Sequence, residues 1–163
     1  MLAASAPFYL RPFGGHDREA DYELLLTLAN AQVPHDPRGN AEWLEHRRAY
    51  DERRGRRRHY IAVHRPTNEP IAYAALEQQQ ADPSSFRIYL VFDPERWSFD
   101  TVGTFLYHQL LRDAEDLQAT KLVCIEYATD AAFRAFLERE DFRLIGDGLY
   151  NGFSIVRYEK MLL

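Results

Sequence analysis

The chain has 163 residues, 46% of them hydrophobic, and 25 acidic against 20 basic side chains give it a formal charge of −5. A length near the roughly 150 residues of an average domain predicts one domain over residues 1–163. The acidic balance argues against nucleic acid as a partner, and the lack of a long apolar run or a leader pattern argues against a membrane, so we expect a cytoplasmic protein.

The first third of the chain predicts a strand followed by two helices. Residues 8–13 (FYLRPF) alternate in polarity and precede two glycines, which is typical of a strand closed by a turn. Apolar side chains at helical spacing predict a helix over residues 20–31, and the two prolines that follow should end it. Because Asn40 is a good N-cap residue, a second helix is expected to begin there and to end near Gly55.

Three β-prone runs follow and predict strands joined by tight connections. They cover residues 59–64, 71–76 and 86–92, with proline-rich and polar turns between them. A basic run, residues 53–59 (RRGRRRH), precedes them. This run could meet a nucleic acid, an acidic partner or a phosphate. We interpret it instead as the solvated C-terminal end of the second helix, where basic side chains complement the helix dipole.

The rest of the chain predicts a crossover and a closing hairpin. Residues 101–115 carry apolar side chains at helical spacing, and residues 121–127 (KLVCIEY) form a nearly continuous apolar strand of the kind that is covered on both faces. A further helix is expected over residues 130–138. Strands over residues 142–145 and 153–161 complete the chain.

The element order is β-α-α-β-β-β-α-β-α-β-β, without an internal repeat. It predicts an α/β (α+β) fold in which a mixed central sheet of about seven strands is flanked by about four helices. A right-handed crossover makes the strands on either side of the third helix parallel, whereas tight turns make their neighbours antiparallel.

This order resembles that of the GCN5-related N-acetyltransferases, the GNAT superfamily, over essentially the whole chain. Residues 91–111 (VFDPERWSFDTVGTFLYHQLL) are similar to the strand, loop and helix with which the family binds the diphosphate of acyl-CoA. Residues 126–142 (EYATDAAFRAFLEREDF) are similar to the family's next strand and helix. The positions that fit these motifs are Val91, Pro94, Gly103, Leu106, Phe136 and Phe142.

The chain departs from both motifs at particular positions. Ser98 stands where the first motif has its arginine, Thr101 stands where it has a glycine, and the loop after Pro94 is one residue longer. In the second motif the usual Asn, Tyr and Gly are replaced by Asp130, Leu137 and Asp141. These departures favour an alternative, which is a GNAT-fold protein without catalysis that serves as a binding or assembly module.

The resemblance implies an acyl-CoA-dependent N-acetyltransferase that transfers an acetyl group from acetyl-CoA to an amine of a small molecule or peptide by direct attack. Its partners would be acetyl-CoA and the amine, and a homodimer stays open. On physical grounds alone, a loop that enters a helix N-terminus exposes N–H groups that can bind a diphosphate. The residues implied in binding acetyl-CoA are Leu90, Val91, Phe92, Arg96, Val102, Gly103, Thr104 and Asp130.

Glu126 is the best candidate for the catalytic base. It ends a buried strand, and a carboxylate that faces a cleft there can have a raised pKa. The alternative is a solvated glutamate paired with a neighbouring basic side chain. Tyr89 is a second catalytic candidate because it alternates along its strand with Arg87 and Val91, so it either lines the acceptor cleft or packs in the core.

Tyr127 is the third catalytic candidate, as a proton donor to the departing thiolate, because Leu137 cannot donate a proton. A packing role for Tyr127 is the alternative. His35 and Tyr73 are expected to contact the substrate, although His35 could also be an ordinary exposed loop residue. The histidines show no metal-ligand spacing, so no metal is expected.

Overall fold

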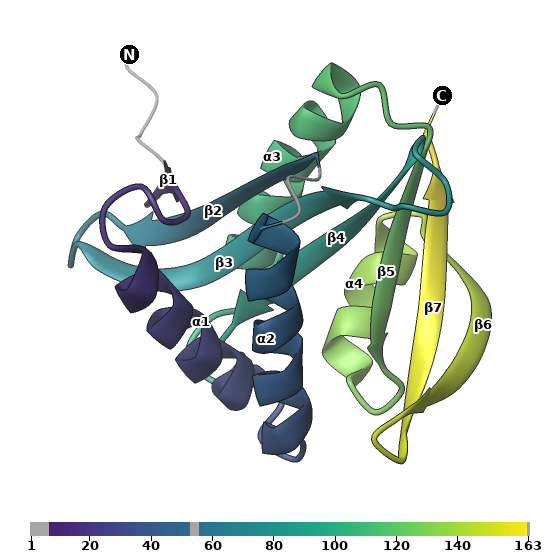
Figure 1. Cartoon of the computed structure of the whole chain (residues 1–163), viewed down its shortest axis with the longest axis horizontal. Helices are drawn as coiled ribbons and strands as arrows, with labels where there is room; N and C mark the ends of the chain where they lie inside the picture. The colour runs from purple at the N-terminus through teal and green to yellow at the C-terminus, as the bar shows by residue number, and fades with distance from the viewer. Residues whose placement is uncertain (1–6, 53–55, 163) are drawn as a thin grey trace.

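The computed structural model describes residues 7–52 and 56–162 and contains the expected elements in the expected order (Figure 1). All seven strands pair into one sheet, in the order β1-β2-β3-β4-β5-β7-β6, which confirms the mixed architecture. The elements are β1 (Phe8–Pro12), α1 (Arg18–Gln32), α2 (Pro37–Glu52), β2 (Arg57–His64), β3 (Glu69–Gln78), β4 (Ser85–Phe92), the π-helical turn η1 (Phe99–Gly103), α3 (Thr104–Asp116), β5 (Lys121–Tyr127), α4 (Ala131–Arg139), β6 (Arg143–Tyr150) and β7 (Phe153–Met161).

Helices cover both faces of the sheet, and each face has its own hydrophobic cluster. On the face covered by α1 and α2, Leu25 and Leu44 pack with Tyr73 of β3. On the opposite face, α3 and α4 contribute side chains such as Leu106 and Phe136. Successive strand residues point to opposite faces, so a central strand supplies both clusters. In the described part of the chain, no helix is both long enough and apolar enough to cross a membrane.

The parallel strands β4 and β5 are paired over only a short length. Ser85 lies opposite Lys121, and the last pair is Arg87 with Val123. Beyond that pair, β4 continues along β3 as far as Phe92, while β5 continues along β7. The two strands therefore separate inside the sheet (Figure 1). The parallel crossover that the sequence predicts is confirmed, and a gap between β4 and β5 lies beside it.

The second helix begins earlier than the sequence predicts, because Asn40 is not its N-cap. Asp36 takes that place, and its carboxylate accepts a hydrogen bond from the backbone N–H of Gly39 at 3.0 Å. Pro37 then fits the first turn, where a missing N–H costs nothing. Asn40 instead donates its side-chain amide to the carbonyl of Val33, 2.9 Å away, and so satisfies the end of α1.

The prediction that the basic run forms the end of the second helix is wrong for Arg57 and Arg58, which belong to strand β2. Arg57 forms an ion pair with Glu77 at 3.2 Å. Arg58 lies 3.0 Å from each of two carboxylates on α3. Residues 53–55 of the run lie outside the described residues. The described strand residues of the run thus join β2 to its neighbours.

A buried polar cluster fixes α2 against the sheet. Arg47 forms an ion pair with Glu77, and it donates a hydrogen bond of 2.8 Å to the hydroxyl of Tyr73. That hydroxyl also lies 3.4 Å from Nδ1 of His59. Desolvation, together with the positive charges of Arg57 and Arg47, lowers the pKa of His59 to about 3. His59 is therefore neutral in the folded protein at neutral and mildly acidic pH.

We expect His59 to make the fold sensitive to acid. Below its unfolded pKa of about 6.5, the unfolded chain takes up a proton that the folded chain excludes down to about pH 3, so stability falls as the pH falls through this window. The loss attributable to His59 at pH 5 is about 2 kcal/mol. His59→Phe should flatten the dependence, as measured by urea unfolding at pH 7, 6 and 5. Parallel slopes for the two proteins would contradict this assignment.

Candidate active site

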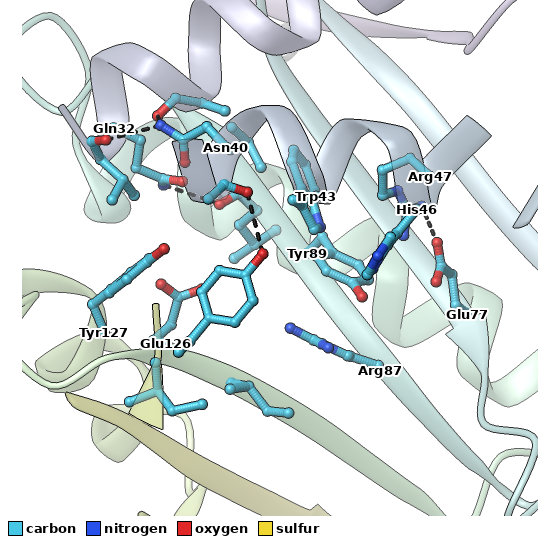
Figure 2. Close-up of a pocket in the computed structure, with 18 of the residues that line it drawn as sticks. Gln32, Asn40, Trp43, His46, Arg47, Glu77, Arg87, Tyr89, Glu126 and Tyr127 are labelled. Carbon is cyan, nitrogen blue, oxygen red and sulfur yellow. Dashed lines mark hydrogen bonds and ion pairs between the residues drawn. The ribbon is translucent and has the colours of Figure 1, made fainter. Parts of the chain in front are cut away.

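A cavity of about 670 Å³ opens where β4 and β5 separate. It lies on the side of the sheet that α1 and α2 cover, and it reaches across the gap to β5 (Figure 2). The residues labelled in Figure 2 are Gln32, Asn40, Trp43, His46, Arg47, Glu77, Arg87, Tyr89, Glu126 and Tyr127. The cavity is therefore built from elements on both sides of the split in the sheet.

Glu126 lines this cavity from β5. Desolvation raises its pKa well above the ordinary value, and the negative charge of Asp130 adds to the effect, while Arg87 opposes it. Asp130 is the N-cap of α4 and accepts a hydrogen bond from the backbone of Phe133 at 3.2 Å. A half-buried carboxyl group with a raised pKa in a cavity has the properties of a general base.

Arg87 lines the same cavity from β4, although the sequence pattern alone did not mark it as a site residue. Its guanidinium carbon lies 4.6 Å from the ring centre of Tyr89. Its Nε is buried and has no hydrogen-bond partner among the described residues. The signal that could have found it is the alternation of Arg87 with Tyr89, since strand residues two apart share a face.

Tyr127 closes one end of the cavity. Its hydroxyl donates a hydrogen bond of 2.7 Å to the carboxyl group of Asp36, the N-cap of α2. Desolvation and that carboxyl group raise the pKa of Tyr127. The ring of His35 packs edge-on against Tyr127, with ring centres 5.0 Å apart. The structure thus brings His35 against Tyr127, but His35 is not among the residues that line the cavity, and the hydroxyl of Tyr127 already donates to Asp36.

An aromatic wall lies on the α2 side of the cavity. Tyr89 and Trp43 both line it, and their ring centres are 5.7 Å apart. Arg47 lies 4.5 Å above the ring of Tyr89 and holds it in place. Tyr73 does not line the cavity, because its side chain is 1% exposed and its hydroxyl belongs to the polar cluster beneath α2.

The backbone of β4 turns some of its polar groups into the gap. The carbonyl of Leu90 accepts a hydrogen bond of 3.0 Å from the side chain of Gln32 rather than from a strand. In a strand the N–H and C=O of one residue point to the same side, and the side alternates along the chain. The backbone of Leu90 and Phe92 therefore faces the gap, whereas that of Val91 faces β3. The side chain of Phe92 is fully buried.

The loop that enters α3 is shaped by the π-helical turn η1. The backbone N–H groups of Thr101 and Gly103 both donate to the carbonyl of Ser98, at 3.3 and 3.2 Å. Thr104 donates its hydroxyl to the carbonyl of Phe99 at 2.9 Å. The wider turn accommodates the additional residue of this loop. Several of the N–H groups expected to face a diphosphate are thus used inside the turn.

Phe99 fills the space between η1 and α4. Its ring centre lies 4.8 Å from that of Phe92 and 4.7 Å from that of Phe133. A Cβ atom on Gly103 would lie 3.0 Å from the Phe99 ring, so packing alone favours a glycine there. Val102 is fully buried beside it.

The charged residues near this loop are engaged by partners on the protein. Arg96 forms a bidentate pair with Glu69, with a shortest distance of 2.9 Å. Asp100 lies 2.8 Å from Arg139 of α4. Asp141 adopts φ 67°, a left-handed conformation that explains why the family pattern has glycine at its position.

No group of three His, Cys, Asp or Glu side chains within residues 7–52 and 56–162 is arranged to hold a metal ion.

Comparison with known proteins identifies the fold. No protein-family model matches the sequence, and no curated protein matches it. Among solved structures, a ribosomal-protein-alanine N-acetyltransferase from Brucella melitensis is 19% identical, with a TM-score of 0.67 over 94% of this chain and 99% of that one. A spermidine N-acetyltransferase SpeG chimera from Vibrio cholerae and hSSAT is 15% identical, with a TM-score of 0.69 over 96% of each chain.

A further solved structure carries a ligand. The acetyltransferase-like protein yncA from Salmonella typhimurium, solved with its cofactor acetyl-CoA, is 13% identical, with a TM-score of 0.66 over 95% of this chain and 94% of that one. At these low identities the likeness concerns the fold. It confirms the fold class that the sequence predicted.

We expect the Tyr127 hydroxyl to stabilise the fold by linking β5 to α2. Tyr127→Phe should lower the free energy of unfolding by about 2 kcal/mol, because the buried carboxyl group of Asp36 loses a donor. The matched control is Tyr150→Phe, which removes a weaker bond of 3.3 Å to the carbonyl of Gly39 and should cost about 0.5 kcal/mol. Urea unfolding measures both, and equal losses would show that the carboxyl link is not special.

Proposed function

We propose that this chain, which has the GNAT fold, is an N-acetyltransferase that moves the acetyl group of acetyl-CoA to an amine. The observation that supports this most directly is the early separation of β4 and β5 beside Glu126. The separation leaves main-chain groups of β4 without a strand partner and opens a cavity for an acceptor at the same place. Such a pairing of main-chain donors with a desolvated base is what amine acylation requires.

Glu126 would act as the base that takes the proton from the attacking amine. An amine attacks only as the free base, and a carboxylate with a raised pKa accepts a proton at neutral pH more readily than an ordinary one. Acetyl-CoA, when bound, supplies the acetyl thioester. The backbone N–H groups of Leu90 and Phe92 are the donors on this chain that could hold the thioester oxygen. The proton needed by the departing thiolate would come from water, or from Tyr127 once its hydroxyl turns away from Asp36.

One set of observations favours the alternative, a binding or assembly module without catalysis. Several N–H groups at the start of α3 are used within the π-helical turn, and the Phe99 ring fills the space next to α4. Asp100 also places a carboxylate at the turn, where a diphosphate would meet a like charge. These features weaken the diphosphate site and leave the gap along β4 unaffected.

Isothermal titration with acetyl-CoA and with CoA separates the two functions. An acetyltransferase should bind both with saturation and should release free thiol when acetyl-CoA is mixed with a suitable amine. An assembly module should bind neither at millimolar concentration. Saturable binding without thiol release from any amine of a broad panel would favour a binding module that retains the cofactor site.

We expect Glu126→Gln to lower kcat/KM for acetyl transfer by about 10²- to 10⁴-fold, because the base is lost. In the unaltered enzyme, kcat/KM should rise with pH through the raised pKa of Glu126, and the variant should lose that rise. The pH–rate profiles of both proteins, from thiol release, make the comparison.

The stability of Glu126→Gln serves as the control for its loss of activity. A carboxyl group whose pKa is raised in the fold favours folding below its unfolded pKa and loses that advantage as the pH rises through its folded pKa. The uncharged glutamine avoids this loss. Glu126→Gln should therefore be at least as stable as the original protein at neutral pH. An active variant with an unchanged pH profile would remove Glu126 from the mechanism.

A further inference from the structure

We propose that the cavity selects an amine that also carries a carboxylate, such as an amino acid, and that Arg87 binds the carboxylate. The amine half of this statement rests on the proposed function. The claim that Arg87 binds a carboxylate rests on the cavity alone. A binding experiment without acetyl-CoA therefore tests this claim separately from the proposed function.

Arg87 differs from the other arginine that lines the cavity. Arg47 is held by an ion pair with Glu77, which it shares with Arg57, and by a hydrogen bond to Tyr73. The buried Nε of each arginine lacks an acceptor, but Arg87 has, in addition, no ion pair with any described residue. Figure 2 shows its guanidinium group reaching into the space that the cavity residues surround. This side chain is therefore a cation available to a ligand.

The chemistry of arginine decides which ligand fits. A guanidinium group cannot lose its charge at any pH of interest, so it must be solvated or paired. Inside a cavity the better partner is an anion, and the planar fork of donors matches a carboxylate through two parallel hydrogen bonds. The carboxyl group of Glu126 also lines the cavity, but no ion pair joins it to Arg87, so the guanidinium group is left to pair with the anion of a ligand.

The position of Arg87 relative to Glu126 sets the size of the acceptor. Arg87 pairs with Val123, and Glu126 lies three residues further along β5, or about 10 Å at the usual rise of a strand. The two side chains approach the cavity from opposite strands (Figure 2). Because both side chains reach toward the cavity, their end groups lie closer together than these backbone positions, so one small molecule can contact both. The rings of Trp43 and Tyr89 supply an apolar wall for its body.

Thermal shift and calorimetry with the standard amino acids, in the absence of acetyl-CoA, provide the test. At least one amino acid should stabilise the protein at millimolar concentration. Its carboxamide, which keeps the amine and the side chain but lacks the anion, should bind at least about 30-fold more weakly. If no amino acid binds, or if the acid and its carboxamide bind equally well, the proposal is overturned.

Variants then identify the anchor. Arg87→Gln should abolish the difference between the acid and its carboxamide. Arg112→Gln, which makes the same charge change on an exposed side chain of α3, should preserve that difference. Arg87→Gln should lose little thermal stability, because it removes the contact with the Tyr89 ring but no ion pair among the described residues. A clear loss of stability with unchanged amino-acid binding would assign Arg87 a structural role and overturn the proposal.

The outcomes also separate this inference from the proposed function. An amino acid that binds through Arg87 without being acetylated would uphold the carboxylate site and count against the acetyltransferase. Acetylation of neutral amines as fast as of amino acids, unchanged in Arg87→Gln, would uphold the acetyltransferase and overturn the carboxylate site.

Discussion

The short pairing of β4 with β5 is the constraint on which the rest of the site depends. Each strand is bound along its length by its other neighbour, β4 by β3 and β5 by β7, so the two can diverge without losing most of their hydrogen bonds. The gap would leave the carbonyl of Leu90 unsatisfied, and Gln32 of α1 supplies the missing donor. The cavity, the position of Glu126 and the access to Arg87 all follow from this divergence.

Buried charge is distributed unequally around the gap. Arg47, Arg57 and Glu77 form an ion-paired group that fixes α2, and with it Trp43, over the sheet. A buried charge without a partner is costly, so paired charges are the rule and unpaired ones call for an explanation. Arg87 and Glu126 face the cavity without an ion pair to any described residue. The residues that stabilise the cavity wall are thus distinct from those left available for chemistry.

The start of α3 differs from the gap between β4 and β5 in what shapes it. Its π-helical turn, the Phe99 ring and Gly103 fit one another as a packed unit, which explains the local sequence without any ligand. The strand gap depends on backbone groups, which substitutions of side chains do not remove. If the chain binds acetyl-CoA as we propose, the gap along β4 would hold the thioester end, whereas the start of α3 offers less to the diphosphate end.

The sequence by itself determined the element order, the parallel crossover and the candidacy of Glu126 and Tyr89, because hydrophobic period, turn residues and strand alternation are local properties of the chain. It misplaced the N-cap of α2 at Asn40, since Asp36 and Asn40 are both capping residues and only the packing of α1 decides between them. The hydrogen bond from Tyr127 to Asp36 joins residues 91 positions apart. Arg87 lacks an ion pair with the described residues because the fold brings no carboxylate into contact with it. Only the tertiary structure decided these features, because pairing, burial and charge compensation are set by neighbours in space rather than along the chain.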